Sequence, residues 1–325
     1  MTPRKIVVPI DFSPHSQAAA ELALAQLEHT GGELRLIHAD PLPGASAATP
    51  EPFYIAPQLW SSLTSAHAKR VAENLESLRR ELSARAPEGA SVYTDLVHRD
   101  PARGILEYAE AEDADLIALG SHGASAATLY LFGSVTERVA REAPCPVLVT
   151  NDDIRVGFEE RDAKIRPFER ALVGVDYSPL SARAAREAAG ILAPGGVLEV
   201  VHVWHAPHLP TMELGIHTRD DELYELLETY RRAEVERLSK FILDLDLGLA
   251  DENLHAYIEV GTAARGMLHR AQETNAELIV LGAHGRETLE EKIVGTVADR
   301  VIRTTSIPAL LIPETAARTH GAPST

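Results

Sequence analysis

Residues 115–123 have the sequence DLIALGSHG, and residues 277–285 repeat the pattern as ELIVLGAHG. Each segment is an apolar run of the length of a buried strand, followed by two glycines. After nine intervening residues, each copy has a further glycine followed by a hydroxyl residue, Gly133-Ser134 and Gly295-Thr296. The question that decides the fold is whether this correspondence extends to the rest of the chain.

Two earlier segments recur at nearly the same separation. KIVVPIDFSPHS at 5–16 matches RALVGVDYSPLS at 170–181, and GGELRLIHA at 31–39 matches GGVLEVVHV at 195–203. The separation drifts only from 165 to 162 positions along the chain. Such a long and regular repeat indicates the duplication of a whole domain.

Each half alternates apolar strand patterns with helical patterns. Continuous Val/Ile/Leu strands separated by helices predict a parallel sheet covered on both faces. Five strands in each half predict an α/β fold with two doubly wound, open, five-stranded parallel-sheet domains in tandem, of Rossmann-like type. The predicted strands are IVVPI, ELRLIHA, SVYTDLV, DLIALG and PVLVT, then ALVGV, LEVVHV, AYIEV, ELIVLG and PALLI. The predicted helices include 16–29, 63–84, 102–112, 135–141 and 222–243.

The domain boundaries follow from composition. We expect a first domain at 1–150, a polar linker at 151–169, a second domain at 170–313 and a C-terminal tail at 314–325. The segment 41–57 contains five prolines and is predicted to be a long surface loop.

The bulk composition excludes several classes of protein. The chain of 325 residues has a net charge of −17, which opposes binding to nucleic acid or to anionic membranes. A single cysteine, Cys145, excludes an internal disulfide and favours a buried small side chain over a reactive thiol. The apolar segment before Asp11 is too short for a secretory signal, and no apolar run reaches the ~20 residues of a membrane span, so we expect a cytoplasmic protein.

The glycines have two explanations. A helix that starts at Ser134 or Thr296 presents unpaired backbone N–H groups and the positive end of its dipole, which suit a phosphate. The missing Cβ atoms would let the backbone approach that phosphate closely, and the hydroxyl can cap the helix or donate to a phosphate oxygen. The alternative is that these are turn glycines. Two copies with identical spacing favour the phosphate cradle, although duplication could also preserve a turn.

Asp11 and Asp176 end the first strand of each half, at the sheet edge that carries the glycines. A carboxylate there can accept from ribose hydroxyls, as in other nucleotide-binding sheets. It can instead cap the following helix, a position for which Ser13 and Ser178 are equally suited.

Other candidate sites are weaker. His202, His205 and His208 recur at a spacing of three, but His202 is expected to end a strand and two prolines follow, which favours loop or surface histidines over a metal site. The GxxxxGK[ST], GxSxG and HExxH motifs are not found in the sequence. His122 and His284 could act as general bases, but no nucleophile is placed beside them at a recognisable spacing.

Together these motifs resemble the universal stress protein family, here as a tandem pair. The resemblance rests on the glycine–hydroxyl spacing, the VPIDFS and VGVDYS openings, LIHA and VHVW on the second strand, and PCPVLV at the end. It implies the adenine-nucleotide alpha-hydrolase-like fold and a bound ATP, ADP or AMP, with or without Mg²⁺. It also implies that PVLVT and PALLI pair or pack across the two domains, so that the domains pair within the chain, and that two chains can form a homodimer.

The resemblance assigns the nucleotide contacts residue by residue. In the first half they are Pro9, Ile10, Asp11, Ser13, Ala39, Gly120, His122, Gly123, Gly133, Ser134, Val135 and Thr136. In the second half they are Val175, Asp176, Ser178, Val203, Gly282, His284, Gly285, Arg286, Gly295, Thr296 and Val297.

The implied function is nucleotide-dependent sensing or regulation in stress tolerance, with weak hydrolysis at most and no catalytic residue or metal ligand assigned. Two alternatives remain open: a slow ATPase, and a nucleotide-free interaction module whose glycine motifs are relics. The two copies differ beside the glycines, where Ala124 and Thr136 of the first correspond to Arg286 and Ala298 of the second. The sequence therefore does not rank the two sites.

Overall fold

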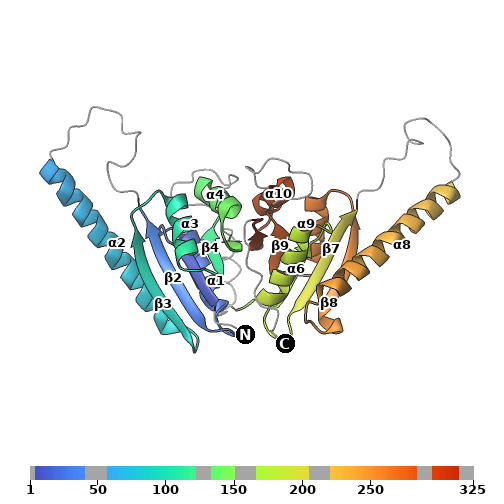
Figure 1. Cartoon of the computed structure of the whole chain (residues 1–325), viewed down its shortest axis with the longest axis horizontal. Coiled ribbons are helices and arrows are strands. Elements are labelled where there is room, and N and C mark those ends of the chain that lie inside the picture. Colours follow the sequence, from blue (N-terminus) through green and yellow to red (C-terminus); the bar gives the residue numbers. More distant parts are fainter. Residues whose placement is uncertain are drawn as a thin grey trace. The chain divides into compact units, whose positions relative to one another are not determined.

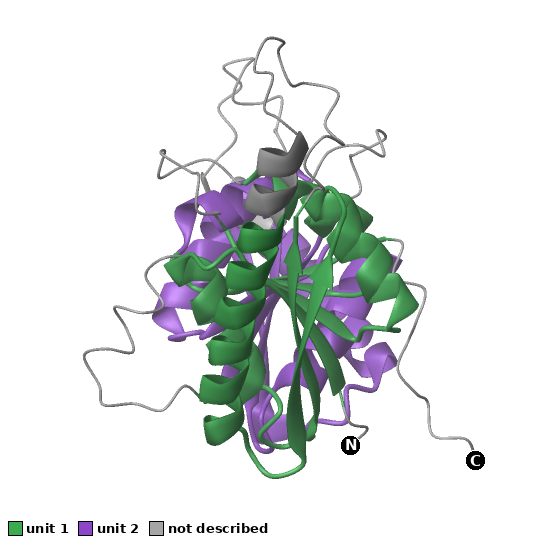
Figure 2. Cartoon of the chain, turned by 90° about the vertical axis from the view of Figure 1, so that its left-hand side faces the viewer, with its two compact units in different colours: residues 1–167, 306–325 green, residues 168–305 purple. Residues whose placement is uncertain are grey.

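The structure is a computed structural model of the chain. It describes residues 4–40, 57–121, 133–150, 166–204, 220–283 and 295–314, with side chains described throughout these ranges except at 57–64, 220–224 and 226–227. The chain folds into two compact units, one of residues 1–167 and 306–325 and one of residues 168–305 (Figure 2).

Unit 1 contains a parallel sheet whose strands follow the order β3-β2-β1-β4-β5 (Figure 1). The strands β4 and β5 are buried along their whole length, which explains their unbroken apolar sequences. Both the doubly wound strand order and the α/β class agree with the fold predicted from sequence. The strands are β1 Arg4–Pro9, β2 Gly32–Ala39, β3 Ala90–Val97, β4 Leu116–Gly120 and β5 Val147–Thr150.

In the described part of unit 1, four helices connect these strands. α1 packs on β1 and β4, and α2 packs on β2 and β3. An ion pair of 3.3 Å between Arg85 and Glu21 joins α2 to α1, whereas α3 packs against α4. The helices are α1 Pro14–Ala25, α2 Pro57–Arg85, α3 Pro101–Ala111 and α4 Ser134–Glu142.

Unit 2 repeats this architecture with a parallel sheet in the order β9-β6-β7-β8. Its strands are β6 Arg170–Gly174, β7 Val197–Trp204, β8 Leu254–Val260 and β9 Leu278–Gly282. Its helices are α6 Pro179–Ile191, α8 Asp220–Leu245, the short 3₁₀ helix η1 Asp251–Asn253, α9 Ala263–Glu273 and α10 Thr296–Thr304. None of the helices within the described ranges is long and apolar enough to cross a membrane.

The last strand of the second repeat belongs to unit 1. β10 (Ala309–Ile312) pairs antiparallel with β5, with Leu310 opposite Leu148. The segments PVLVT and PALLI therefore do pair, as the resemblance implied. This pairing is also why unit 2 ends near residue 305, although the second sequence repeat continues to 313.

Two helix starts differ from the sequence-based prediction. α2 begins at Pro57, which the sequence analysis placed in a surface loop. Proline is favourable at the first position of a helix because its missing N–H would have no partner there. α1 begins at Pro14 for the same reason, with Ser13 as its N-cap, and it ends at Ala25 rather than near His29.

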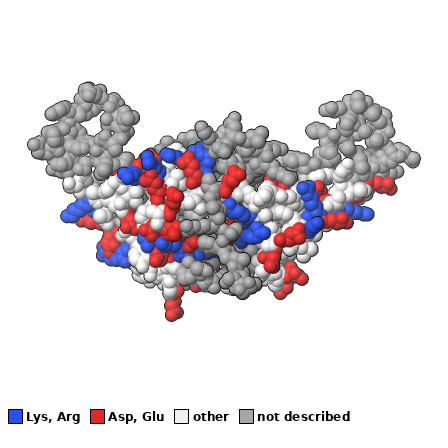
Figure 3. Space-filling view, viewed as in Figure 1, with Lys and Arg blue, Asp and Glu red and all other residues white. Residues whose placement is uncertain are grey.

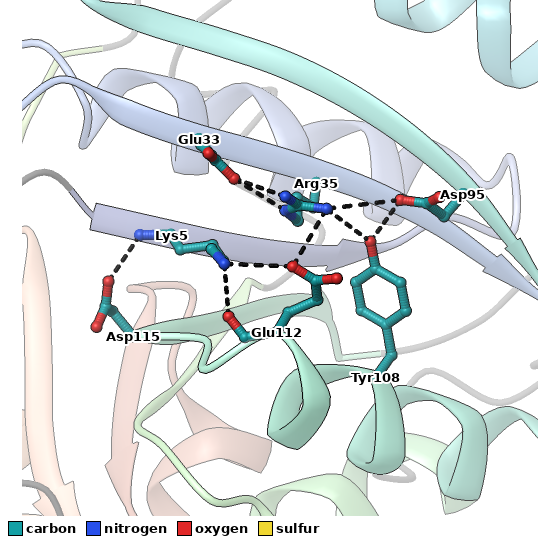
Figure 4. Close-up of polar contacts among 7 residues, drawn as sticks. All are labelled: Lys5, Glu33, Arg35, Asp95, Tyr108, Glu112 and Asp115. Carbon is teal, nitrogen blue, oxygen red and sulfur yellow. Dashed lines mark hydrogen bonds and ion pairs between the residues drawn. The ribbon is translucent and has the colours of Figure 1, made fainter.

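A polar network lies between β1, β2 and α3 in unit 1 (Figure 4). Arg35 Nη2 lies 2.8 Å from Glu33 Oε2, and Arg35 Nη1 lies 3.3 Å from Glu112 Oε2. Lys5 Nζ lies 3.2 Å from the same Glu112 oxygen. In unit 2 the position of Arg35 is taken by Glu199, which is 1% exposed and pairs with Arg170. The two repeats thus fill one position with opposite charges.

Charged side chains of both signs intermingle over the described residues of the face shown in Figure 3. Many belong to pairs one helical turn apart, such as Arg103–Glu107 at 2.6 Å and Arg303–Asp299 at 2.7 Å. Exposed pairs of this kind contribute little to stability. These ion pairs explain why the helices are rich in charged residues, and no binding partner is needed to explain it.

Two glycine pairs test the backbone geometry, Gly31-Gly32 at the start of β2 and Gly195-Gly196 before β7. Gly32 has a φ of +122°, and a Cβ atom there would lie 2.0 Å from the carbonyl oxygen of Arg4. Gly195 has a φ of +79°, but a Cβ atom there would have no described atom within 4 Å. We expect Gly32→Ala to lower the free energy of unfolding by about 3 kcal/mol or more, from strain and steric overlap together. Gly195→Ala should cost only about 1–2 kcal/mol, and equal losses in urea unfolding would contradict this account.

Tyr108 provides a second test. Burial, and then the hydrogen bond that its hydroxyl donates to Asp95, raise the pKa of Tyr108 to about 12. The folded chain favours the neutral phenol, so this contribution to stability is complete below the ordinary pKa of about 10. It is lost as the pH rises from there through 12. The ultraviolet difference titration between the wild type and Tyr108→Phe should show one phenolate forming near pH 12, and a midpoint near pH 10 would refute the assignment.

Candidate functional site

The carboxyl ends of the first and fourth strands meet at one edge of each sheet. In unit 1, β1 pairs with β4 in parallel, so Asp11 follows one strand at the edge where Gly120 ends the other. In unit 2, β6 and β9 place Asp176 and Gly282 in the same relation. This is the topological position at which open α/β sheets bind ligands.

The turn between β1 and α1 assigns separate roles to the aspartate and the serine. Asp11 Oδ1 accepts a hydrogen bond of 3.0 Å from the backbone N–H of Ser13. Ser13 Oγ accepts from the backbone N–H of Ser16 at 3.2 Å and is the N-cap of α1. The serine therefore caps the helix, while the aspartate orders the turn.

Unit 2 repeats this turn almost without change. Asp176 Oδ1 accepts from the Ser178 N–H at 3.0 Å, and Ser178 Oγ caps α6 by accepting from the Ser181 N–H at 3.1 Å. Of the two alternatives left open by the sequence, helix capping by the aspartate is excluded in both units.

An aromatic residue in a left-handed backbone conformation lies between the aspartate and the serine. Phe12 has a φ of 64° and Tyr177 a φ of 65°. This conformation costs a residue with a bulky side chain about 1–2 kcal/mol. Strained backbone that recurs at equivalent positions is typical of functional sites.

Each aromatic ring contacts a histidine at the end of the second strand. The Phe12 and His38 rings are stacked with their centroids 5.3 Å apart, and those of Tyr177 and His202 are 4.4 Å apart. His38 Nδ1 lies 2.6 Å from the carbonyl oxygen of Ile10, and His202 Nδ1 lies 2.8 Å from that of Val175. A carbonyl oxygen only accepts, so Nδ1 carries the proton in both rings.

In unit 2 the Tyr177 side chain also contacts two charged residues of α8. Its hydroxyl donates to Glu234 at 3.1 Å, and the Arg237 guanidinium lies 4.1 Å from the centre of its ring. Burial, and then the bond to Glu234, raise the pKa of the Tyr177 hydroxyl. Phe12 has no hydroxyl for such a bond, so the two sites differ here.

The helices after the glycine motifs begin without a side-chain cap. Gly133 is the N-cap of α4, and Gly295 is the N-cap of α10. The first intrahelical bond of α4 is donated by the N–H of Glu137 to the Gly133 carbonyl at 2.8 Å. The prediction that Ser134 and Thr296 can cap these helices is wrong, because both are exposed first residues of the helix itself.

These glycines are not needed for the backbone conformation. Gly133 has φ −61° and ψ 138°, and Gly295 has φ −55° and ψ 145°. Any residue can adopt these values. The strands β4 and β9 likewise hold Gly120 and Gly282 in extended backbone. A left-handed backbone conformation therefore does not explain the glycine at these four positions.

Thr136 connects the helix start to the strand end in unit 1. Its hydroxyl donates to the Gly120 carbonyl at 2.9 Å, and the residue is buried. The resemblance placed Thr136 against ribose or phosphate, whereas the structure gives its hydroxyl this bond within the protein. The equivalent residue in unit 2 is Ala298, which cannot form it.

The described residues of the predicted site gather at the two sheet edges. Pro9 ends β1, Ile10 and Val175 are buried directly after β1 and β6, and Ala39 and Val203 lie near the ends of β2 and β7. Val135 and Val297 occupy the first turns of α4 and α10. Five predicted contacts lie outside the described residues: His122, Gly123, His284, Gly285 and Arg286.

Sequence reasoning missed three polar residues beside the first site. His38 on β2, Asp40 directly after it and His67 on α2 lie close together, with His67 Nε2 2.9 Å from Asp40 Oδ2. The LIHA motif contains His38, but no spacing rule connects it with a residue in the next helix.

Comparisons with known proteins agree with the repeat. The model of the universal stress protein family matches residues 2–151 and again residues 167–313. A universal stress protein of Mycobacterium tuberculosis is 27% identical over 318 residues, covering 95% of this chain and 98% of its own. One from Thermus aquaticus is 33% identical over 149 residues, covering 45% of this chain and 97% of its own. The crystal structure of a universal stress protein from Archaeoglobus fulgidus covers 95% of both chains with a TM-score of 0.62 at 23% identity, which shows a shared fold.

The bond of Thr136 predicts a measurable difference between two Thr→Val substitutions. Thr136→Val keeps the shape but leaves the Gly120 carbonyl without its donor, so the free energy of unfolding should fall by about 1–2 kcal/mol. Thr296→Val, at the exposed start of α10, should change it by less than about 0.5 kcal/mol. Equal effects in denaturant titrations without nucleotide would show that the Thr136 bond does not stabilise the chain.

Proposed function

Because the chain belongs to the universal stress protein family, we propose that each of its two repeats binds one adenine nucleotide, ATP, ADP or AMP. Family membership supports a stress-related role. Within that role we propose that the chain acts as a nucleotide-dependent sensor or regulator in the cytoplasm, with weak hydrolysis of ATP at most.

The observation that carries this proposal is the pair of uncapped helix starts. In α4 and α10 the N-cap is glycine, without a side-chain cap in either helix. The N–H groups of Gly133 and Gly295 donate to the carbonyl oxygens of Ser121 and Ala283. The N–H groups of the residues that follow have no side-chain cap, and the helix dipole adds a partial positive charge. Both features favour a phosphate group, and the absent Cβ leaves room for it. Gly133, Ser134 and Val135 would face the phosphates in the first site, and Gly295, Thr296 and Val297 in the second.

The ribose and the adenine would lie at the carboxyl ends of the first and second strands of each unit. Asp11 and Asp176 are held by their turns beside the start of α1 and α6, where a carboxylate can accept from ribose hydroxyls. The backbone near Ile10 and Ala39, and near Val175 and Val203, offers donors and acceptors for the adenine edge. When Mg²⁺ accompanies ATP, we expect the phosphates themselves to supply most of its ligands.

The two sites need not be equal in affinity. In unit 1 the hydrogen bond of the Thr136 hydroxyl links α4 to β4, whereas in unit 2 Ala298 has no hydroxyl to form it. Tyr177 in unit 2 also has hydroxyl contacts that Phe12 lacks. We further propose that the β5–β10 ladder reflects a pairing of the two repeats within the chain, and that two chains can associate as a homodimer.

Glycine-to-serine substitutions at the two helix starts separate the phosphate cradle from a structural turn. Serine is at least as good an N-cap as glycine, so Gly133→Ser and Gly295→Ser should leave the free energy of unfolding within about 0.5 kcal/mol of the wild type. Its side chain would, however, fill the phosphate space and satisfy a helix N–H group. We expect each substitution to weaken its own site at least about tenfold, which is ~1.4 kcal/mol.

Calorimetry with ATP measures the affinity of the sites and their number directly. The wild type should bind two nucleotides per chain, each single variant should keep one site of unchanged affinity and one weakened site, and the double variant should have both sites weakened. Unchanged affinity in both variants would refute the cradle. Phosphate release measured on the same proteins tests hydrolysis, because activity that survives the double substitution would come from another site or from a contaminant.

A further inference from the structure

His38, Asp40 and His67 form a cluster of potential metal ligands in unit 1. One ligand atom from each lies within 4.8 Å of those of the other two. Over the described ranges of the chain, this is the one group of three or more His, Cys, Asp or Glu side chains arranged in this way. We propose that this cluster binds a divalent transition-metal ion of the zinc class, at a site separate from the phosphate cradle.

The ligand types select the metal. Two imidazoles and one carboxylate suit Zn²⁺, and also Co²⁺ or Ni²⁺, whereas Mg²⁺ prefers oxygen ligands. Three protein ligands would leave a fourth, tetrahedral position for water or another small ligand. The site is therefore distinct in chemistry from any Mg²⁺ that accompanies a nucleotide.

His38 is held in the form that a metal ligand requires. Its Nδ1 donates to the Ile10 carbonyl at 2.6 Å, so Nε2 is the nitrogen with the available lone pair. The stacked ring of Phe12 restricts its rotation further. A backbone carbonyl that fixes the tautomer and ring plane of a histidine is the usual support for a metal-bound imidazole.

The other two ligands are accessible and able to adjust. The His67 side chain is 45% exposed and that of Asp40 is 32% exposed, so an ion can reach them from solvent. Ligand atoms around a tetrahedral zinc lie about 3.3 Å apart, as follows from bond lengths of ~2.0–2.2 Å. His67 Nε2 and Asp40 Oδ2 are already 2.9 Å apart, and rotation of these exposed side chains can close the remaining distance.

Among its described residues the second repeat has no equivalent cluster, which makes it an internal control. His202 occupies the place of His38 and makes the same bond to a carbonyl, that of Val175. The residue equivalent to Asp40 is Trp204, two positions after His202. When the buried Leu75 of α2 is aligned with the buried Leu238 of α8, the residue equivalent to His67 is Tyr230, because each precedes its leucine by the same number of residues. The proposal therefore predicts one zinc ion for each chain.

Zinc titration of the full chain tests the proposal. The protein, made without a histidine tag and stripped with a chelator, would be titrated with ZnCl₂ against a chromophoric competitor, without nucleotide. We expect one ion per chain with a dissociation constant below about 10 μM. Loss of a residue that merely supports a metal ligand weakens metal sites by about 10–100-fold. Loss of a ligand itself, in His67→Gln or Asp40→Asn, should therefore weaken this site by about a hundredfold or more.

The matched control is His202→Gln, which should leave the zinc affinity unchanged. Co²⁺ should give the visible absorption of a tetrahedral site in the wild type and in His202→Gln, but not in His67→Gln. Because His67 is exposed, its substitution should leave the melting temperature of the metal-free protein unchanged. Absence of zinc uptake at 100 μM would overturn the proposal. So would equal uptake by His67→Gln and the wild type, which would assign the ion to other histidines.

Discussion

The parallel pairing of the first strand with both the second and the fourth strand is the constraint on which each site depends. In unit 1 it brings the carboxyl ends of β2, β1 and β4 to one edge, and in unit 2 those of β7, β6 and β9. β1 and β4 are followed by different helices, α1 and α4, and it is at such strand ends that doubly wound sheets bind ligands. Asp11, the uncapped start of α4 and His38 are neighbours of this edge because of the strand order, although they lie far apart in sequence.

Much of this fold could be predicted from sequence because the duplication is explicit. Apolar runs such as LIALG and LIVLG locate the buried strands, and Asp11 and Asp176 mark their edge. Helix ends were harder, because the start at Pro57 and the cap at Gly133 depend on local backbone geometry that composition does not show. The cluster of His38, Asp40 and His67 could not be predicted, because it requires the packing of α2 beside the end of β2. The phosphate role of His122 and Arg286 stays a prediction.

The two repeats share the backbone geometry of their strand ends but differ in the side chains beside it. Both retain the aspartate turn, the left-handed aromatic residue, the serine cap and the glycine helix start. They differ at Thr136 against Ala298, at Arg35 against Glu199 and at Asp40 against Trp204. Backbone geometry at the strand ends is thus common to both sites, whereas the neighbouring side chains allow them to differ in affinity and in additional ligands.

The central claim is that the chain holds two adenine-nucleotide sites built on glycine-capped helix starts. Native mass spectrometry of the full chain in increasing ATP tests it most directly, because it counts ligands on each molecule. The account predicts successive mass increments of one and then two nucleotides per chain at micromolar to millimolar ATP. A spectrum that shows only the unliganded, folded chain at millimolar ATP would contradict it.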